Sequence, residues 1–178
     1  MPETASIGKA DADVRVSPRR IELWLPIAIV VLDQITKAMV RAKLPLYAST
    51  TIIPGFMDFT HVPNSGTAFG LLQGVNFPFK TTVIAMIAAT AMISVGLYAA
   101  SLAKHQLIAR IGLALIIGGA AGNLIDRVVT GSVVDFVDVY WRTYHFWVFN
   151  VADSAISIGV TVMILDMLGL GTHASNTA

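Results

Sequence analysis

The chain has 178 residues, of which 55% are hydrophobic and 13% are charged, and its mean hydropathy is +0.71. A soluble domain of this size needs more charge to cover its surface, so the composition predicts a membrane protein. The formal net charge of +1 provides no basic stripe for binding phosphates, which argues against a nucleic-acid partner. Cysteine is absent, and this excludes disulfides, thiolate nucleophiles and cysteine-ligated metals.

The first predicted membrane span covers about 21–40. The polar residues before it, 1–18, carry both charge signs and predict a disordered tail. The span has 20 residues, just enough to cross the hydrocarbon of a bilayer, and contains Asp33 and Lys37. These two lie four residues apart on one helix face, so an ion pair that lowers the cost of insertion and a direct functional role explain them equally well.

Three more spans are predicted, over about 81–103, 107–129 and 150–168. The first of these has 23 residues without a charge, which is the clearest membrane signal in the chain. The four spans form one membrane domain over 19–170, and a short disordered tail follows at 171–178. The predicted class is therefore an all-α membrane protein with four transmembrane helices.

The orientation in the membrane is set by the charges next to the first span. Four spans place both termini on one side, and Arg15, Arg19 and Arg20 favour a cytoplasmic N-terminus. The full tally is less decisive, with six basic residues inside and five outside. Both tails are then cytoplasmic, and the two longer connections between spans lie on the outer side.

The two outer connections have different compositions. Residues 41–80 contain β-branched and aromatic stretches at 51–53 and 56–62 around Pro54-Gly55, which predicts short strands in a small sheet on the membrane. Residues 130–149 contain Trp141, Tyr144, Phe146 and Trp147, a composition typical of a membrane interface. We expect a small β-layer and an interfacial segment outside the bilayer.

Acidic residues from separate segments fall at one depth, near the outer face of the membrane. The alternation of span directions brings to this level Asp33, Asp126, Asp135 and Asp153. Alone, Asp135 can be an interfacial loop acid and Asp153 a helix-start acid stabilised by the helix dipole. Their shared depth favours a pair. Two carboxylates in a dry site tend to share one proton, as in aspartic proteases, and the sequence leaves open which one is the base.

The third span contains small residues at Gly118 and Gly122, which suit close helix packing in lipid. Asn123 and Arg127 follow, four residues apart on one face, and can hydrogen-bond a peptide backbone or a carboxylate. Asn64 is by default a turn residue. The four histidines, His61, His105, His145 and His173, show no metal-ligand spacing, so neither a metal nor another cofactor is expected.

Five stretches of the sequence resemble, in order, the motifs of the bacterial lipoprotein signal peptidases, also called type II signal peptidases. They begin at Asp33 and end at Ser154, and they read DQITK at 33–37, NSGTAF at 64–69, GGAAGNLIDR at 118–127, VDF at 134–136 and FNVADS at 149–154. The resemblance implies four helices, a small periplasmic β-layer and an interfacial helix.

The resemblance also implies an activity and the residues that carry it. The enzyme would be an intramembrane aspartyl endopeptidase of the bacterial inner membrane, cutting prolipoproteins before a diacylglyceryl-modified cysteine near the periplasmic face. Asp135 and Asp153 would form the catalytic pair. Substrate contacts would come from Asn64, Asn123, Arg127 and Asn150, and supporting roles from Asp33, Lys37, Gly66 and Asp126. Membrane lipid surrounds such an enzyme, and globomycin-type lipopeptides would inhibit it.

Two other functions fit parts of the sequence. A small proton-coupled transporter could use Asp33, Asp126 and Asp153 as a proton path, although a relay should place ionisable groups at several depths. An inert scaffold packed through the glycine-rich helix would leave the pairing of Asp135 with Asp153 unexplained.

Overall fold

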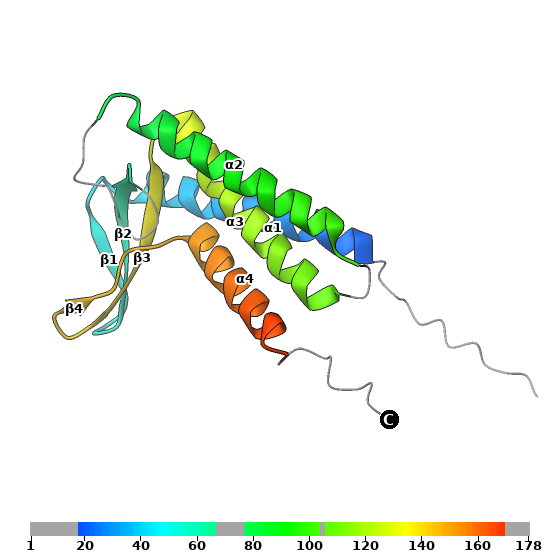
Figure 1. Cartoon of the computed structure of the whole chain (residues 1–178). Coiled ribbons are helices and arrows are strands. Elements are labelled where there is room, and N and C mark those ends of the chain that lie inside the picture. The colour runs from blue at the N-terminus through cyan, green and yellow to red at the C-terminus, as the bar shows by residue number, and fades with distance from the viewer. Residues whose placement is uncertain (1–17, 67–76, 104–105, 170–178) are drawn as a thin grey trace, which may run out of the picture.

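The computed structural model describes residues 18–66, 77–103 and 106–169. Helices lie side by side at one end of the molecule and a small sheet crosses the other end (Figure 1). In chain order the elements are α1 (Pro18–Lys43), β1 (Ser49–Ile53), β2 (Met57–Asn64), α2 (Lys80–Ser101), α3 (Leu107–Thr130), β3 (Val133–Trp141), β4 (Tyr144–His145) and α4 (Val151–Met167). The four predicted spans correspond to α1, α2, α3 and α4.

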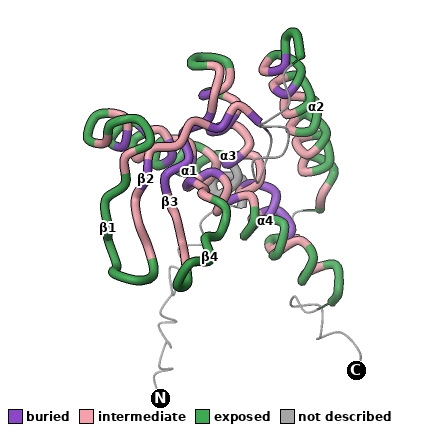
Figure 2. Tube along the Cα trace, turned by 90° about the vertical axis from the view of Figure 1, so that its left-hand side faces the viewer, coloured by how far each residue is buried: buried purple, intermediate pink, exposed green. Residues whose placement is uncertain are grey.

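Helix α3 is the centre of the helical layer, because it packs against α1, α2 and α4. Half of its most apolar window is buried, compared with 6% for α2, which therefore leaves much of its apolar surface exposed. In Figure 2, α2 stands at the edge of the molecule and is coloured mostly as intermediate and exposed. An apolar helix exposed in this way needs lipid around it.

Three helices are long and apolar enough to cross a membrane within the described ranges: Leu23–Lys43 of α1, α2 and α3. Helix α4 has 17 residues and is shorter than these. The structure therefore contains three helices suited by length and composition to cross a membrane, and a shorter fourth helix beside them.

The glycines of α3 allow close helix contacts. A side chain at Gly118 would meet the Cα atom of Pro26 in α1 at 2.9 Å, and one at Gly122 would meet Oδ2 of Asp33 at 2.6 Å. On another face, Gly119 lies against the backbone carbonyl of Ala152 in α4. Small residues at these positions let helix backbones approach in lipid, as predicted for Gly118 and Gly122.

The sheet is antiparallel, and its four strands lie in the order β1-β2-β3-β4. Strands β1 and β2 confirm the two predicted around Pro54-Gly55. Strands β3 and β4 were not predicted, because the aromatic residues of 130–149 indicated only an interface. The sheet is thus larger than expected, and the term all-α understates it. No further helix forms between α3 and α4, or between α1 and α2 in the described residues 44–66 and 77–79, and residues 67–76 lie outside the described ranges.

A hydrophobic cluster joins the sheet to the end of α1. It contains Val40, Val134 and Phe136, and the ring of Phe136 meets that of Phe59 edge to face at 5.7 Å between centroids. Side chains alternate between the two faces of a strand. Because Val134 and Phe136 face α1, the residue between them, Asp135, points to the opposite face of β3.

Candidate active site

Asp135 lies on β3, one short turn after α3 ends at Gly131. Gly131 adopts a φ of 79°, a left-handed conformation that ends helices and suits glycine. Asp135 is 4% exposed, and its two oxygens accept hydrogen bonds from Nδ2 of Asn64 at 2.9 Å and Nδ2 of Asn150 at 2.7 Å. Burial, together with the negative charge of Asp153, raises the pKa of Asp135 from 3.8 to about 7.

Asp153 lies in the first turn of α4, where it completes a capping box with Asn150. The backbone N–H of Asp153 donates to Oδ1 of Asn150 at 2.9 Å, and the backbone N–H of Asn150 donates to Oδ2 of Asp153 at 3.2 Å. Oδ1 of Asp153 accepts from Nδ2 of Asn123 at 2.8 Å. The capping box thus fixes the Asp153 carboxylate at the helix N-terminus, where the helix dipole favours negative charge.

Three asparagines hold the two carboxylates, and their side-chain orientations are fixed by donors on their far side. The Oδ1 atoms accept from the N–H of Gly66 at 2.9 Å for Asn64 and from Nζ of Lys37 at 2.9 Å for Asn123. For Asn150 the donor is the N–H of the capping box. A donor must meet the amide oxygen, so each amide nitrogen is turned toward a carboxylate.

A buried network of charged side chains contacts Asn123 on the side away from Asp153. Nζ of Lys37 is 2.7 Å from Oδ2 of Asp33 and 2.8 Å from Oδ2 of Asp126, and all three side chains are at most 2% exposed. Nη2 of Arg41 is 2.8 Å from Oδ1 of Asp126, so two cations balance two carboxylates. The predicted pairing of Asp33 with Lys37 is present. Breaking a buried pair by removing one partner is costly, because it leaves an uncompensated charge.

Asp33 also connects this network to the start of α4. Its Oδ1 accepts the backbone N–H of Ala152 at 3.0 Å, one of the donors that a helix N-terminus leaves without an intrahelical partner. The side chain of Asp33 thereby joins α1 to the turn that carries Asp153.

Arg127 holds two backbone segments together near the carboxylates. Its Nη2 donates to the carbonyl of Gly66 at 3.0 Å, and its Nη1 donates to the carbonyl of Asn123 at 3.1 Å. Gly66 follows β2, so Arg127 joins α3 to the chain beyond that strand. The residues with expected substrate contacts therefore all have partners within the protein, while Asn64, Asn123 and Arg127 also line the cavity described next.

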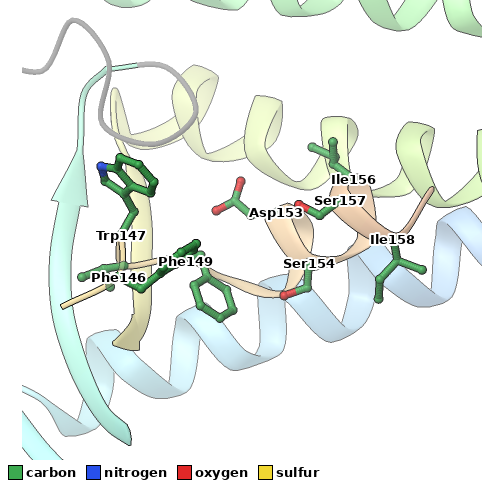
Figure 3. A pocket seen from close by; sticks show the side chains of 9 residues that line it. Phe146, Trp147, Phe149, Asp153, Ser154, Ile156, Ser157 and Ile158 are labelled. Atoms are coloured by element: carbon green, nitrogen blue, oxygen red, sulfur yellow. The ribbon is translucent and has the colours of Figure 1, made fainter. Parts of the chain in front are cut away.

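Two cavities meet at Asp153. One, of about 240 Å³, is lined by Asp135, Asp153 and the polar residues at their side, and continues between apolar side chains of α2 and α3. The other, of about 310 Å³, lies between the segment 146–149 and the start of α4. Figure 3 shows the Asp153 carboxylate pointing into this second space, on the side of Trp147. A carboxylate pair beside apolar cavities suits an extended, largely apolar peptide.

Two residues of the site were not predicted. Arg41 was counted only as an outer charge, although its position four residues after Lys37 places it on the same helix face and could have revealed its contact with Asp126. Gln34 donates from Nε2 to Oδ2 of Asp33 and to the carbonyl of Gly122, both at 3.2 Å. No sequence signal distinguishes Gln34 from an ordinary polar neighbour.

Within the described ranges, no group of three or more His, Asp or Glu side chains is placed to hold a metal ion. The histidines have other contacts. His61 is 2.9 Å from the carbonyl of Leu44, and His145 is 2.9 Å from Oδ2 of Asp138.

A family model described as signal peptidase (SPase) II matches residues 25–169 of the chain. Two similar proteins are named lipoprotein signal peptidase. The one from Geobacter metallireducens is 44% identical over 138 residues, which are 78% of this chain and 84% of that protein. The one from Pseudomonas aeruginosa is 39% identical over 146 residues, 82% of this chain and 86% of its own length.

Two solved structures are also similar to the chain. A structure described as a bacterial membrane enzyme, determined by the in meso method at 2.3 Å resolution, superposes with a TM-score of 0.77 and 29% sequence identity. The match covers 89% of this chain and 94% of that one. A second, at 1.9 Å resolution, has a TM-score of 0.75 at 30% identity and covers 84% and 93% of the two chains.

Proposed function

The chain belongs to the signal peptidase II family, and we propose that it removes signal peptides from bacterial prolipoproteins by hydrolysis at Asp135 and Asp153. One observation carries the assignment of these two residues. They come from separate elements, β3 and α4, yet line the same cavity, and each of their four oxygens accepts a hydrogen bond from an asparagine N–H. Such an arrangement positions a carboxylate pair for general acid–base catalysis.

The two carboxylates divide the proton transfers. The pair shares one proton, and we assign the negative charge to Asp153 because it lies at the N-terminus of α4, and the proton to Asp135, whose pKa is raised to about 7. Asp153 takes a proton from water as the water oxygen bonds to the amide carbon, while Asp135 donates its proton to the carbonyl oxygen. The tetrahedral intermediate then collapses: Asp153 passes its proton to the leaving nitrogen, Asp135 takes back a proton from a hydroxyl of the intermediate, and the C–N bond breaks to release a carboxylic acid and an amine.

The substrate is a prolipoprotein whose cysteine already carries diacylglycerol, and the cut falls just before that cysteine. Both cavities at Asp153 are lined mainly by apolar side chains, which suits a signal peptide within the membrane. An extended peptide in lipid needs partners for its backbone polar groups. Asn64, Asn123, Asn150 and Arg127 are the polar side chains available for this, by exchanging some of their present contacts for the substrate.

The placement in the membrane follows from the same proposal. The chain lies in the bacterial inner membrane with α4 as a fourth span, and both termini are cytoplasmic. The sheet and the carboxylate pair then lie toward the periplasmic face. Arg19 and Arg20 before the first span support this orientation.

The family assignment disfavours the transporter that the sequence left open, because the matched relatives are peptidases over most of the chain. The geometry agrees, since Asp33 and Asp126 each form a buried ion pair with Lys37, which does not suit carboxylates that pass protons along a path. An inert scaffold would give no reason for the three asparagines aimed at the pair.

The activity can be tested with the purified chain reconstituted in phospholipid vesicles. A diacylglyceryl-modified prolipoprotein should lose its signal peptide, and a globomycin-type lipopeptide should block the release. The matched control is the same prolipoprotein with an unmodified cysteine, which should remain uncut. Equal cleavage of both forms, or none of the modified one, would contradict the proposal.

A further inference from the structure

A third cavity lies away from the carboxylate pair, in the corner between α1 and the sheet. It has a volume of about 410 Å³, within the range of about 300–1,000 Å³ that is common for ligand pockets. Its walls come from the last two turns of α1, from β1, and from the rings of Phe59 and Phe136. Phe136 faces this cavity while Asp135 faces the other side of β3, so the two sites are separate.

The lining is mostly apolar, and its polar members are Thr36, Thr50 and, at one edge, Lys43, which ends α1. The hydroxyl of Thr36 donates to the carbonyls of Leu32 and Asp33 in its own helix, at 2.9 Å each, and so leaves its methyl group for the cavity. No acidic residue is among the lining residues. Water gains little in such a space, whereas a hydrocarbon chain is favoured there.

Lys43 is an exposed cation without a carboxylate partner in the part of the chain that the structure describes. Arg41, two residues earlier, by contrast forms an ion pair with Asp126, with 2.8 Å between Nη2 and Oδ1. Lys43 is the last residue of a membrane-spanning helix, which is the depth at which lysine side chains reach lipid phosphates. The cavity thus combines a site for an acyl chain with a positive charge at its edge.

We propose that this cavity binds a membrane phospholipid with an anionic headgroup. One acyl chain lies between α1 and the inner face of the sheet, against Val40 and Phe136, and the phosphate lies beside Lys43. The lipid fills the corner that joins β3 to α1. This lipid stays bound to the protein and is not consumed by the peptidase reaction.

Native mass spectrometry of the detergent-purified chain tests this proposal, with phosphatidylglycerol and phosphatidylcholine of identical acyl chains added in turn. The wild type should retain phosphatidylglycerol about fivefold more than phosphatidylcholine, the ratio expected for one cation near an anionic lipid. Lys43→Gln should remove this preference. Arg142→Gln, which neutralises an exposed cation in the β3–β4 turn, should preserve it.

Adjacent threonines of β1 provide a matched pair for the acyl chain. Thr50 lines the cavity, whereas Thr51 points to the other face of the strand. Thr50→Trp should fill the cavity and lower retention of both lipids, and Thr51→Trp should leave retention unchanged. Equal loss in both variants, or no preference in the wild type, would overturn the proposal.

A further outcome concerns the substrate. Prolipoprotein cleavage by Thr50→Trp should stay within twofold of the wild type. If KM rises instead while kcat is kept, the cavity holds the diacylglyceryl group of the substrate, and the assignment to a resident phospholipid is wrong. Cleavage by the wild type is measured in parallel, so failure of the proposed peptidase function would be recognised separately.

Discussion

Lys37 donates a hydrogen bond from Nζ to Oδ1 of Asn123 at 2.9 Å, and this contact turns the amide nitrogen of Asn123 toward Asp153. An asparagine without such a donor can flip its amide and present its oxygen to the carboxylate. The buried charge of Lys37 therefore acts on Asp153 through the orientation of one side chain. Asp33 and Asp126 keep Lys37 in place.

Removing this lysine should impair catalysis even when the charge balance is kept. The double variant Lys37→Met with Asp33→Asn loses one charge of each sign, so the network stays neutral and the protein should fold. The Oδ1 atom of Asn123 then keeps only the longer hydrogen bond from Nδ2 of Asn150 at 3.2 Å, so its amide is held less firmly. We expect kcat to fall by about 10²-fold, the cost of a misplaced catalytic group. Lys43→Met, an exposed lysine on the same helix, is the control. Unchanged kcat in the double variant would show that Lys37 does not position Asn123.

The pH dependence of cleavage should reflect the raised pKa of Asp135. The reaction needs one shared proton, and Asp135 is protonated below about pH 7 and ionised above it. We therefore predict that kcat/KM falls tenfold for each pH unit well above 7. The measurement is the pH dependence of kcat/KM for the enzyme reconstituted in phospholipid vesicles. A profile that stays flat to pH 9 would mean that Asp135 does not supply the proton.

Glycines in two helices should respond in opposite ways to alanine. A Cβ atom at Gly122 would lie 2.6 Å from Oδ2 of Asp33, so Gly122→Ala should push Asp33 away from Lys37 and lower stability by about 1–3 kcal/mol. Gly96 in α2 has nothing within 4 Å of such an atom, and Gly96→Ala should be neutral or stabilising by up to about 1 kcal/mol. Thermal unfolding in detergent compares the two. Similar stabilities would contradict the close contact of α1 with α3.

Chelators should leave the activity unchanged. The oxygens of Asp135 and Asp153 already accept hydrogen bonds from asparagines, and those of Asp126 meet Lys37 and Arg41. The measurement is cleavage before and after dialysis against EDTA. A loss that zinc or another divalent ion restores would show a metal site instead of a carboxylate pair.

Much of the site was predictable because it follows from depth and helix spacing. Residues 33 and 37 share a helix face, and antiparallel spans bring the start of α4 to the end of α3. The resemblance to a family then separated Asp135 and Asp153 from Asp126, which depth alone ranks equally. The structure shows a difference that supports this proposal: Asp126 contacts Lys37 and Arg41, whereas the donors to Asp135 and Asp153 among the described residues are amides.

The sheet shows where sequence patterns were insufficient. In Val133–Trp141 polar and apolar residues alternate only weakly. Its valines and aromatic residues are as typical of an interfacial loop as of a strand. Its pairing with β2 depends on residues far away in the chain; Asp135, for example, lies opposite Val62. Likewise, the orientation of the Asn123 amide depends on Nζ of Lys37 in α1, 86 positions earlier in the chain. Such long-range contacts leave no local signal.

The central claim is that Asp135 and Asp153 together carry out the cleavage. The most direct test is the single-turnover rate on diacylglyceryl-modified prolipoprotein for Asp135→Asn and for Asp153→Asn, each shown to be inserted and folded by thermal unfolding. We predict that both variants lose cleavage entirely, because an asparagine amide can neither take a proton from water as a carboxylate does nor donate one as a carboxylic acid does. Substantial turnover by either folded variant would contradict the assignment of the pair.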